Sequence, residues 1–151
     1  MTESAAARIP LPSPVDVAAP EGFARLDLFD PFEAHVGPLF EREAADGARV
    51  LAFRVDERHV RADGTAHEGM MMTAADACMG SVAWRGAGGK SCVTLSMQTS
   101  YLDDVRLGDV VECAARIEHR TRAIVFVSAD FTVRGAPVMT ATSLWKVLGE
   151  R

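Results

Sequence analysis

One segment, residues 68–85, constrains the fold of this chain more than any other. Apolar side chains occupy almost every position in it, and it is long enough for a helix of about five turns. Glycines at positions 86, 88 and 89 end it. A helix that is apolar on every side is expected to be buried on every side. A sheet must therefore cover one side and something else the other, and a partner subunit is the economical cover.

The segments around this helix have the pattern of β-strands. Residues 49–60 form a mostly apolar run, and residues 61–67 are expected to form a loop. Four further strand-like runs follow the helix, over residues 91–102, 110–117, 123–133 and 137–148. In the first of these runs, the apolar residues expected to share one face are Val93, Leu95, Met97 and Tyr101. This order predicts an α+β fold in which antiparallel strands wrap one long central helix.

The first residues differ in composition from the rest. Four of the seven prolines lie within the first 20 residues, among Ala and Ser. Residues 1–21 are therefore expected to form a flexible or loosely docked arm. Residues 22–151 are expected to form a single domain, as a chain of 151 residues suggests. Apolar residues three to four apart over residues 22–45 predict one or two short helices.

The charge balance and the cysteines narrow the class of protein. With 16 Lys and Arg against 21 Asp and Glu, the formal net charge is −5, which argues against a sequence-independent nucleic-acid binder. Cys78, Cys92 and Cys113 are odd in number and lack zinc-site spacing. A reducing compartment is the simplest interpretation, with neither metal nor disulfide needed. Because no signal peptide or long apolar run is present, we expect a cytoplasmic protein without a membrane segment.

Asp76 is the only charged residue between Glu68 and Arg85. Burial of an unpaired carboxylate costs several kcal/mol, so this Asp is expected to be paired, to face a wet cleft or to serve a function. The structural alternative is a hydrogen bond to a neighbouring strand. His67 and Gly69 lie at the helix start, where free amides suit a developing oxyanion and where His67 could polarise a carbonyl. The alternative is a histidine that caps or braces the loop.

Several separated motifs together resemble one known family. They are His67-Glu-Gly-Met-Met-Met-Thr-Ala-Ala-Asp76, then Val93-Thr-Leu-Ser-Met-Gln-Thr-Ser-Tyr101-Leu, and then Leu107-Gly108-Asp109. From about Glu57 to Leu148 the chain resembles the hotdog-fold acyl-CoA thioesterases of the phenylacetate-pathway (PaaI-like) type. The resemblance implies a hotdog fold, in which an antiparallel sheet of five or six strands wraps around one long central helix.

The resemblance also implies roles for individual residues. Asp76 corresponds to the acidic residue that acts as nucleophile or general base on the thioester. The amide of Glu68, with Gly69 beside it, lies where the family forms its oxyanion hole, after the loop that contains His67. Thr94 corresponds to the Ser or Thr that helps to hold the attacking water. The cleft of the family lies between two subunits, so a homodimer, often paired into a dimer of dimers, is implied.

Two positions depart from the family pattern. The family has an Asn six residues before the His, where this chain has Arg61, and its His-Gly-Gly has Gly where this chain has Glu68. A backbone donor survives a change of side chain, so the amide of Glu68 remains a candidate. The two changed residues can pair with each other, or Glu68 can simply favour the helix N-terminus.

Coenzyme A carries phosphates, which an acidic protein must receive on local basic residues. Arg120 and Arg122 lie in a strand connection where similar proteins place basic residues near the nucleotide, and Lys90, Arg106 and Arg85 are further candidates. The alternative is a solvated charged turn. No separate cofactor and no metal are expected, because coenzyme A is part of the substrate.

The expected function is hydrolysis of an acyl-CoA or aryl-CoA thioester to the free acid and coenzyme A. In this interpretation Asp76 is the general base or nucleophile and the helix N-terminal amides form the oxyanion hole. The alternative is a non-catalytic hotdog protein that binds acyl-CoA, in which Arg61 and Glu68 mark the loss of catalysis.

Overall fold

The computed structural model describes residues 11–28 and 30–149. In chain order its helices and strands are β1 (Ala24–Arg25), α1 (Pro31–Val36), β2 (Phe40–Glu43), β3 (Arg49–Arg54), α2 (Glu68–Gly86), β4 (Cys92–Tyr101), β5 (Val110–Arg120), β6 (Ile124–Val133) and β7 (Ala136–Val147). Residues 1–10 of the expected arm lie outside the described part. Residues 11–21 form no helix or strand, and the Arg25 side chain donates to the Val15 carbonyl at 3.2 Å.

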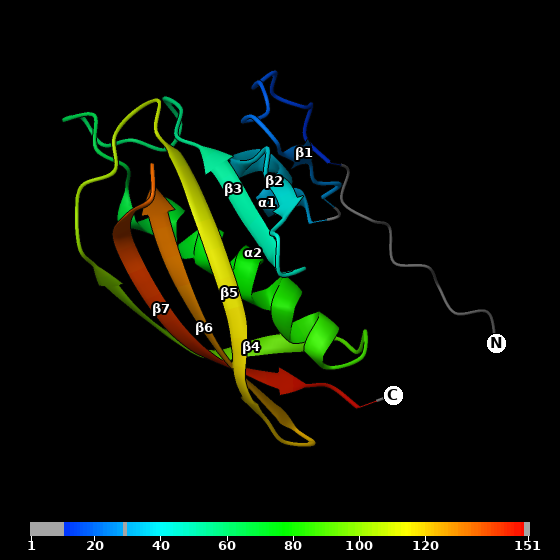
Figure 1. Cartoon of the computed structure of the whole chain (residues 1–151). Helices are drawn as coiled ribbons and strands as arrows, with labels where there is room; N and C mark the ends of the chain where they lie inside the picture. Colours follow the sequence, from blue (N-terminus) through cyan, green and yellow to red (C-terminus); the bar gives the residue numbers. More distant parts are fainter. Residues whose placement is uncertain (1–10, 29, 150–151) are drawn as a thin grey trace.

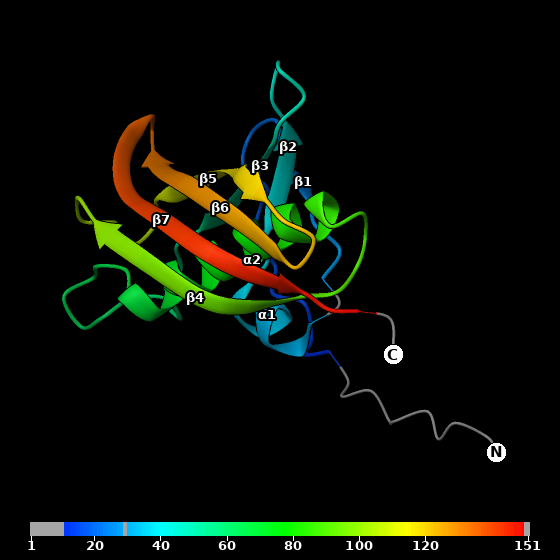
Figure 2. The same ribbon diagram turned by 90° about the horizontal axis from the view of Figure 1, so that it is seen from below.

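All strands join one antiparallel sheet in the order β1-β2-β3-β5-β6-β7-β4. The sheet curves around α2 (Figure 1), which confirms the expected α+β hotdog arrangement. In the described part of the chain it has seven strands rather than five or six. The chain passes from α2 to β4 at the far edge, so β4 pairs with β7 and not with β5 (Figure 2). One long side of β4 is therefore unpaired within the described chain.

The two additional strands lie where short helices were expected. Among the described residues of 22–45 the one helix is α1, which agrees with the lower number of the one or two short helices expected, and it is flanked by β1 and β2. Asp30 caps α1 by accepting from the amides of Phe32 and Glu33. The helix ends before Pro38, and the chain then enters a hairpin with β3. The spacing of apolar residues predicts a helix here, but the segment forms strands because it pairs with β3. Such pairing is a tertiary interaction, which the local sequence period does not report.

The central helix packs against the sheet through the face that contains Ala75, Cys78, Met79 and Ala83, each at most 1% exposed. The expected burial on every side is wrong for the single chain. Met72 is 42% exposed, Trp84 is 51% exposed and Asp76 is also exposed. These residues lie on the side of the helix that the sheet does not cover. The methionines at positions 70, 71 and 79 are core residues.

The cysteines differ from the sequence-based interpretation. Cys78 of α2 and Cys113 of β5 are paired as a disulfide, and Cys92 is free. Sequence spacing gave no sign of this pair because a helix and a strand 35 residues apart bring the two sulfur atoms together. Across the described residues, we find no helix that combines the length and the hydropathy required to cross a membrane.

A β-bulge changes which side chains of β4 face the helix. The register with β7 shifts between Thr94 and Ser96, so Leu95 has no partner. Before the bulge Thr94 is directed toward α2, and after it Met97 is the residue packed on the core. The expectation that Val93 and Leu95 share one face with Met97 was therefore wrong: Val93 and Leu95 are 43% and 52% exposed, whereas Met97 packs on the core. A bulge reverses the alternation of a strand and can direct a side chain toward a site.

Candidate active site

The clearest pair of polar side chains links α2 to β4. The Thr94 hydroxyl donates to Asp76 Oδ1 at 2.7 Å. Both side chains are exposed, and together they line a cavity of about 410 Å³ whose wall includes Glu33 of α1. The carboxylate is thus both paired with a neighbouring strand and open to solvent. Such a carboxylate can accept a proton from water or attack an electrophile directly.

The start of α2 forms a second polar group. His67 is the N-cap, and its Nδ1 accepts from the Gly69 amide at 2.9 Å. In a neutral ring the proton is then on Nε2, which can donate to a ligand. The Gly69 amide is occupied by this cap, so only the Glu68 amide fits the expected oxyanion donor. The Glu68 N–H donates to no acceptor among the described residues. The capping role that the sequence left open for His67 is therefore confirmed.

The two residues that depart from the family pattern contact each other. Arg61 Nη1 donates to Glu68 Oε1 at 2.7 Å, and the same guanidinium donates twice to Thr65 Oγ1. The Thr65 hydroxyl in turn donates to Asp63 at 2.5 Å, which ties Arg61 to the loop. The expected pairing is confirmed. It draws the Glu68 carboxylate toward the loop, while its amide remains at the first turn of the helix.

These two groups do not meet within one chain. Glu68 and Asp76 are eight residues apart on α2, which corresponds to about 12 Å along the helix axis. His67 lines a different cavity, of about 510 Å³, from the one that Asp76 and Thr94 share. Phe32 of α1 contributes to both cavities. A single chain thus contains both halves of the expected site, but holds them apart.

The candidate basic residues are divided between the two ends of α2. Arg120 lies near Cys92: burial raises the pKa of the Cys92 thiol, and the positive charge of Arg120 opposes this rise. Lys90 and Arg122 lie in the connections that flank β4 and β5 at this end. Arg106 instead forms a β-bridge with Thr65, near the start of the helix, and an ion pair with Asp104. Since α2 has 19 residues, the two ends are about 28 Å apart.

Sequence reasoning missed Glu33. Its side chain lines two cavities together with Asp76, and its pKa is raised, first by burial and then by the neighbouring Asp30 and Asp76 carboxylates. The local sequence Asp30-Pro-Phe-Glu33 has the pattern of a capping box, which indicates a helix start and not a site. Only the packing of α1 on α2 brings Glu33 to Asp76.

Comparison with known proteins identifies the family. Residues 63–138, which contain His67, Asp76 and Thr94, match the family model of the thioesterase superfamily. The chain belongs to the thioesterase superfamily. This thioesterase is therefore a thioester hydrolase, and its antiparallel sheet and long helix are those of hotdog thioesterases.

Three relatives illustrate the likeness. The thioesterase is 33% identical to "Putative esterase PA0474" of Pseudomonas aeruginosa over 73% of its own length and 83% of that protein. It is 27% identical to human acyl-coenzyme A thioesterase 13 over 67% of its own length and 72% of that protein. Among solved structures, a mutant of the phenylacetic acid degradation protein PaaI of Thermus thermophilus superposes with a TM-score of 0.67 at 27% identity, covering 79% of this chain and all of that one (100%).

Proposed function

We propose that this thioesterase hydrolyses acyl-CoA or aryl-CoA thioesters to the free acid and coenzyme A. The observation that carries the proposal is the exposed Asp76 carboxylate, held by the Thr94 hydroxyl at the wall of a cavity. The name of the human relative, acyl-coenzyme A thioesterase 13, supports coenzyme A as the thiol of the substrate.

In the proposed reaction Asp76 acts as general base or as nucleophile. As a base it removes a proton from water while the water oxygen bonds to the thioester carbon. As a nucleophile it forms an anhydride with the acyl group, which water then cleaves. In both cases the negative charge that develops on the carbonyl oxygen is stabilised by the Glu68 amide and His67 Nε2. The carbon–sulfur bond breaks and coenzyme A leaves; its sulfur takes the proton back from Asp76 in the base route and takes a proton from solvent in the nucleophile route.

We further propose that the enzyme works as a homodimer joined along β4. This ten-residue strand lies at the sheet edge and exposes Val93 and Leu95 there. A long apolar edge invites pairing with another strand. A two-fold axis reverses the direction of the partner's helix, so the Asp76 half of one chain can meet the His67 half of the other. A dimer of such dimers is the assembly that we expect.

Arg120, Arg122 and Lys90 are proposed to receive the phosphates of coenzyme A. They share one end of α2: Arg120 is the last residue of β5, and Lys90 and Arg122 lie in the connections before β4 and after β5. In a two-fold dimer this end of one chain lies beside the helix start of the other, so Arg106 of one subunit and Arg120 of its partner are expected to flank the same ligand.

The decisive experiment is thiol release from a panel of short, long and aromatic acyl-CoA substrates, with Asp76→Asn as the matched variant. Asn keeps the shape of Asp but cannot act as a base or nucleophile, so we expect kcat to fall by at least about 100-fold. Wild-type turnover indistinguishable from buffer across the panel, or an unimpaired Asp76→Asn variant, would contradict the proposal.

The Arg61–Glu68 ion pair favours a second candidate function. Even when Arg61 holds it toward the loop, the Glu68 carboxylate belongs to the residue whose amide is the proposed oxyanion donor, and its negative charge opposes a developing oxyanion, which suits binding of acyl-CoA without turnover. Calorimetry separates the two candidates. Tight binding of an acyl-CoA that remains intact over the course of the titration supports the binding protein, whereas release of free coenzyme A supports the enzyme.

A further inference from the structure

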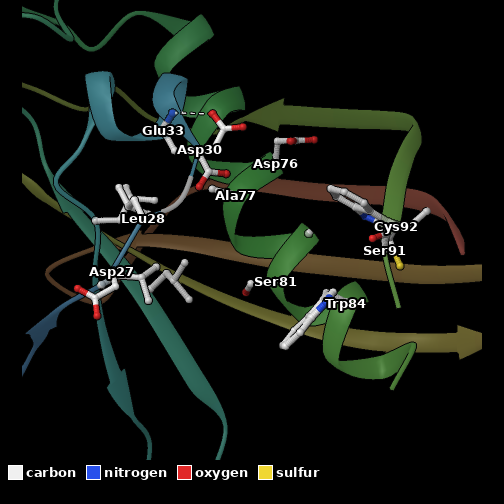
Figure 3. A pocket seen from close by; sticks show the side chains of 15 residues that line it. Asp27, Leu28, Asp30, Glu33, Asp76, Ala77, Ser81, Trp84, Ser91 and Cys92 are labelled. Carbon is white, nitrogen blue, oxygen red and sulfur yellow. Dashed lines mark hydrogen bonds between the residues drawn. The ribbon is translucent and has the colours of Figure 1, made fainter. Parts of the chain in front are cut away.

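A second, larger cavity begins at Asp76 and follows α2 toward its C-terminal end. Its volume is about 630 Å³, within the range of small-molecule sites. Asp76 and Trp84 mark its extent along the helix, which is about 12 Å for eight residues. Figure 3 shows the N-terminal segment with Leu28 on one side of the helix and Cys92 of β4 on the other.

The residues that line this cavity are of two kinds, apolar and acidic. Leucines at positions 26, 28, 39 and 51 and the tryptophans at 84 and 145 supply apolar surface. Among the described residues, those that line the cavity and are charged are all acidic: Asp27, Asp30, Glu33 and Asp76. The Asp30 carboxylate is occupied by the cap of α1. Of the carboxyls of Asp30 and Glu33, that of Glu33 is therefore the one that can contact a ligand that enters beside Asp76.

The shape of the cavity also depends on a small residue in α2. A Cβ at Gly80 would lie 2.9 Å from Cη2 of Trp145. The Trp145 ring is held in place because its Nε1 donates to Ser143 Oγ at 2.7 Å. The absence of a side chain at Gly80 thus lets the indole close the side of the cavity, which gives it a flat aromatic wall.

We propose that this cavity receives the acyl group of the substrate and that Glu33 makes the enzyme select acyl groups without a negative charge. The proposal rests on the proposed function, since the thioester carbonyl must lie at Asp76 for the acyl group to enter here. An apolar chain or aryl ring gains free energy on the leucine and tryptophan walls. An acyl group with its own carboxylate would lose water, and the charged side chains that it would meet among the described lining residues are all acidic.

The raised pKa of Glu33 fits this arrangement, because burial and the Asp30 and Asp76 carboxylates disfavour any additional negative charge at this end of the cavity. The other titratable groups that line it are Asp27 of the N-terminal segment and Cys92 of β4. Neither of them supplies a positive charge that could receive a carboxylate.

The test compares two substrates of equal chain length. Hexanoyl-CoA ends in a methyl group, whereas adipoyl-CoA has a carboxylate at the end of the same six-carbon chain. We expect wild-type kcat/KM to favour hexanoyl-CoA by about tenfold or more. In Glu33→Gln this preference should fall by about threefold or more, mainly through faster hydrolysis of adipoyl-CoA. The matched control is Glu43→Gln, at the exposed end of β2, which should keep the wild-type preference.

A second variant tests the location of the acyl group. Ser81 lines the cavity about 7.5 Å along α2 from Asp76, so Ser81→Leu should lower kcat/KM for hexanoyl-CoA and spare acetyl-CoA. Equal preferences in wild type and Glu33→Gln would overturn the role of Glu33, and equal losses on both chain lengths in Ser81→Leu would overturn the cavity. If no thioester is hydrolysed, the proposed function fails instead. The same comparisons made on dissociation constants by calorimetry then decide the inference.

Discussion

At the scale of single residues, the side-chain hydrogen bond between Thr94 and Asp76 holds the proposed base in one orientation. Its donor comes from β4 and its acceptor from the middle of α2, 18 positions earlier in the chain. A carboxylate oriented in this way leaves its second oxygen for water or for the thioester carbon. Orientation of this kind affects the rate of the chemical step more than the binding of substrate.

Removal of the Thr94 hydroxyl should therefore lower kcat by about tenfold and change KM little. The variant is Thr94→Ala, and Ser96→Ala, which removes an exposed hydroxyl from the same strand, is its control. Steady-state thiol release measures both. Equal kinetics of the two variants would show that the hydrogen bond does not contribute to the reaction.

The Arg61–Glu68 ion pair leads to a second prediction. Both side chains are more than 40% exposed, so the pair should contribute less than about 1 kcal/mol to stability. Its effect on activity should be larger, because Arg61→Ala leaves a carboxylate next to the developing oxyanion. We expect kcat/KM to fall by about tenfold in Arg61→Ala and to recover in Arg61→Ala/Glu68→Ala. Additive effects in this double-mutant cycle, measured with thermal melts as a check on folding, would contradict the coupling.

At the scale of secondary structure elements, α1 is a short helix fixed to the loop after β3. Arg58 donates to the carbonyls of His35 and Gly37, at 2.6 and 2.5 Å. The buried His59 accepts from the Asp56 amide at Nδ1, while its Nε2 donates to the Val36 carbonyl at 2.7 Å. Because α1 contains Glu33, these contacts also hold one wall of the proposed site.

This arrangement requires a neutral His59 and makes stability depend on pH. Burial is the main cause of its lowered pKa, opposed by the Val36 carbonyl and Asp56. As pH falls below about 6.5, the unfolded chain takes up a proton that the folded protein resists, so stability is lost. Melting temperatures between about pH 7.5 and 5.5 should therefore fall less steeply in His59→Gln than in wild type. His119→Gln, at an exposed site, should keep the wild-type slope.

The strands show which parts of the elements can be predicted from sequence. Residues 91–102 were expected as a strand, and β4 spans Cys92–Tyr101, because alternation and flanking glycines are local signals. The expectation that Val93 shares a face with Met97 was wrong, because the bulge at Leu95 between them arises from pairing with β7. The strands β1 and β2 were not predicted either, because they form through pairing with other segments, β1 with β2 and β2 with β3.

At the scale of the whole molecule, the candidate site also consists of residues that local sequence can predict and residues that only the packing brings in. Asp76 and His67 could be selected from residue type and position, since a charge in an apolar helix and a histidine at its start are unusual. Glu33 could not, because it reaches Asp76 only through the packing of α1 on α2. Nor could sequence show that the Gly69 amide is already occupied by His67.

The separation of the two half-sites leads to a prediction about assembly. If Asp76 of one subunit acts with His67 and Glu68 of its partner, Asp76→Asn and His67→Ala dimers should each have little activity. Subunits mixed by refolding together should form about half heterodimers, each with one intact site and one doubly altered site. Activity should then recover to about a quarter of the wild-type value at equal subunit concentration.

Recovery distinguishes a shared site from a site within one chain, since in the latter case every subunit of the mixture retains a defect. The control is a mixture of Asp76→Asn with Thr94→Ala, two changes in the same half-site. A heterodimer of these variants contains no intact site, so its mixture should show no gain over the sum of its components. Gel filtration with light scattering checks that both mixtures form dimers or dimers of dimers, as the wild type does. If the assembled mixture of Asp76→Asn and His67→Ala recovers no activity, the complete site lies within one chain. In that case α1 or the loop before α2 would have to move toward Asp76.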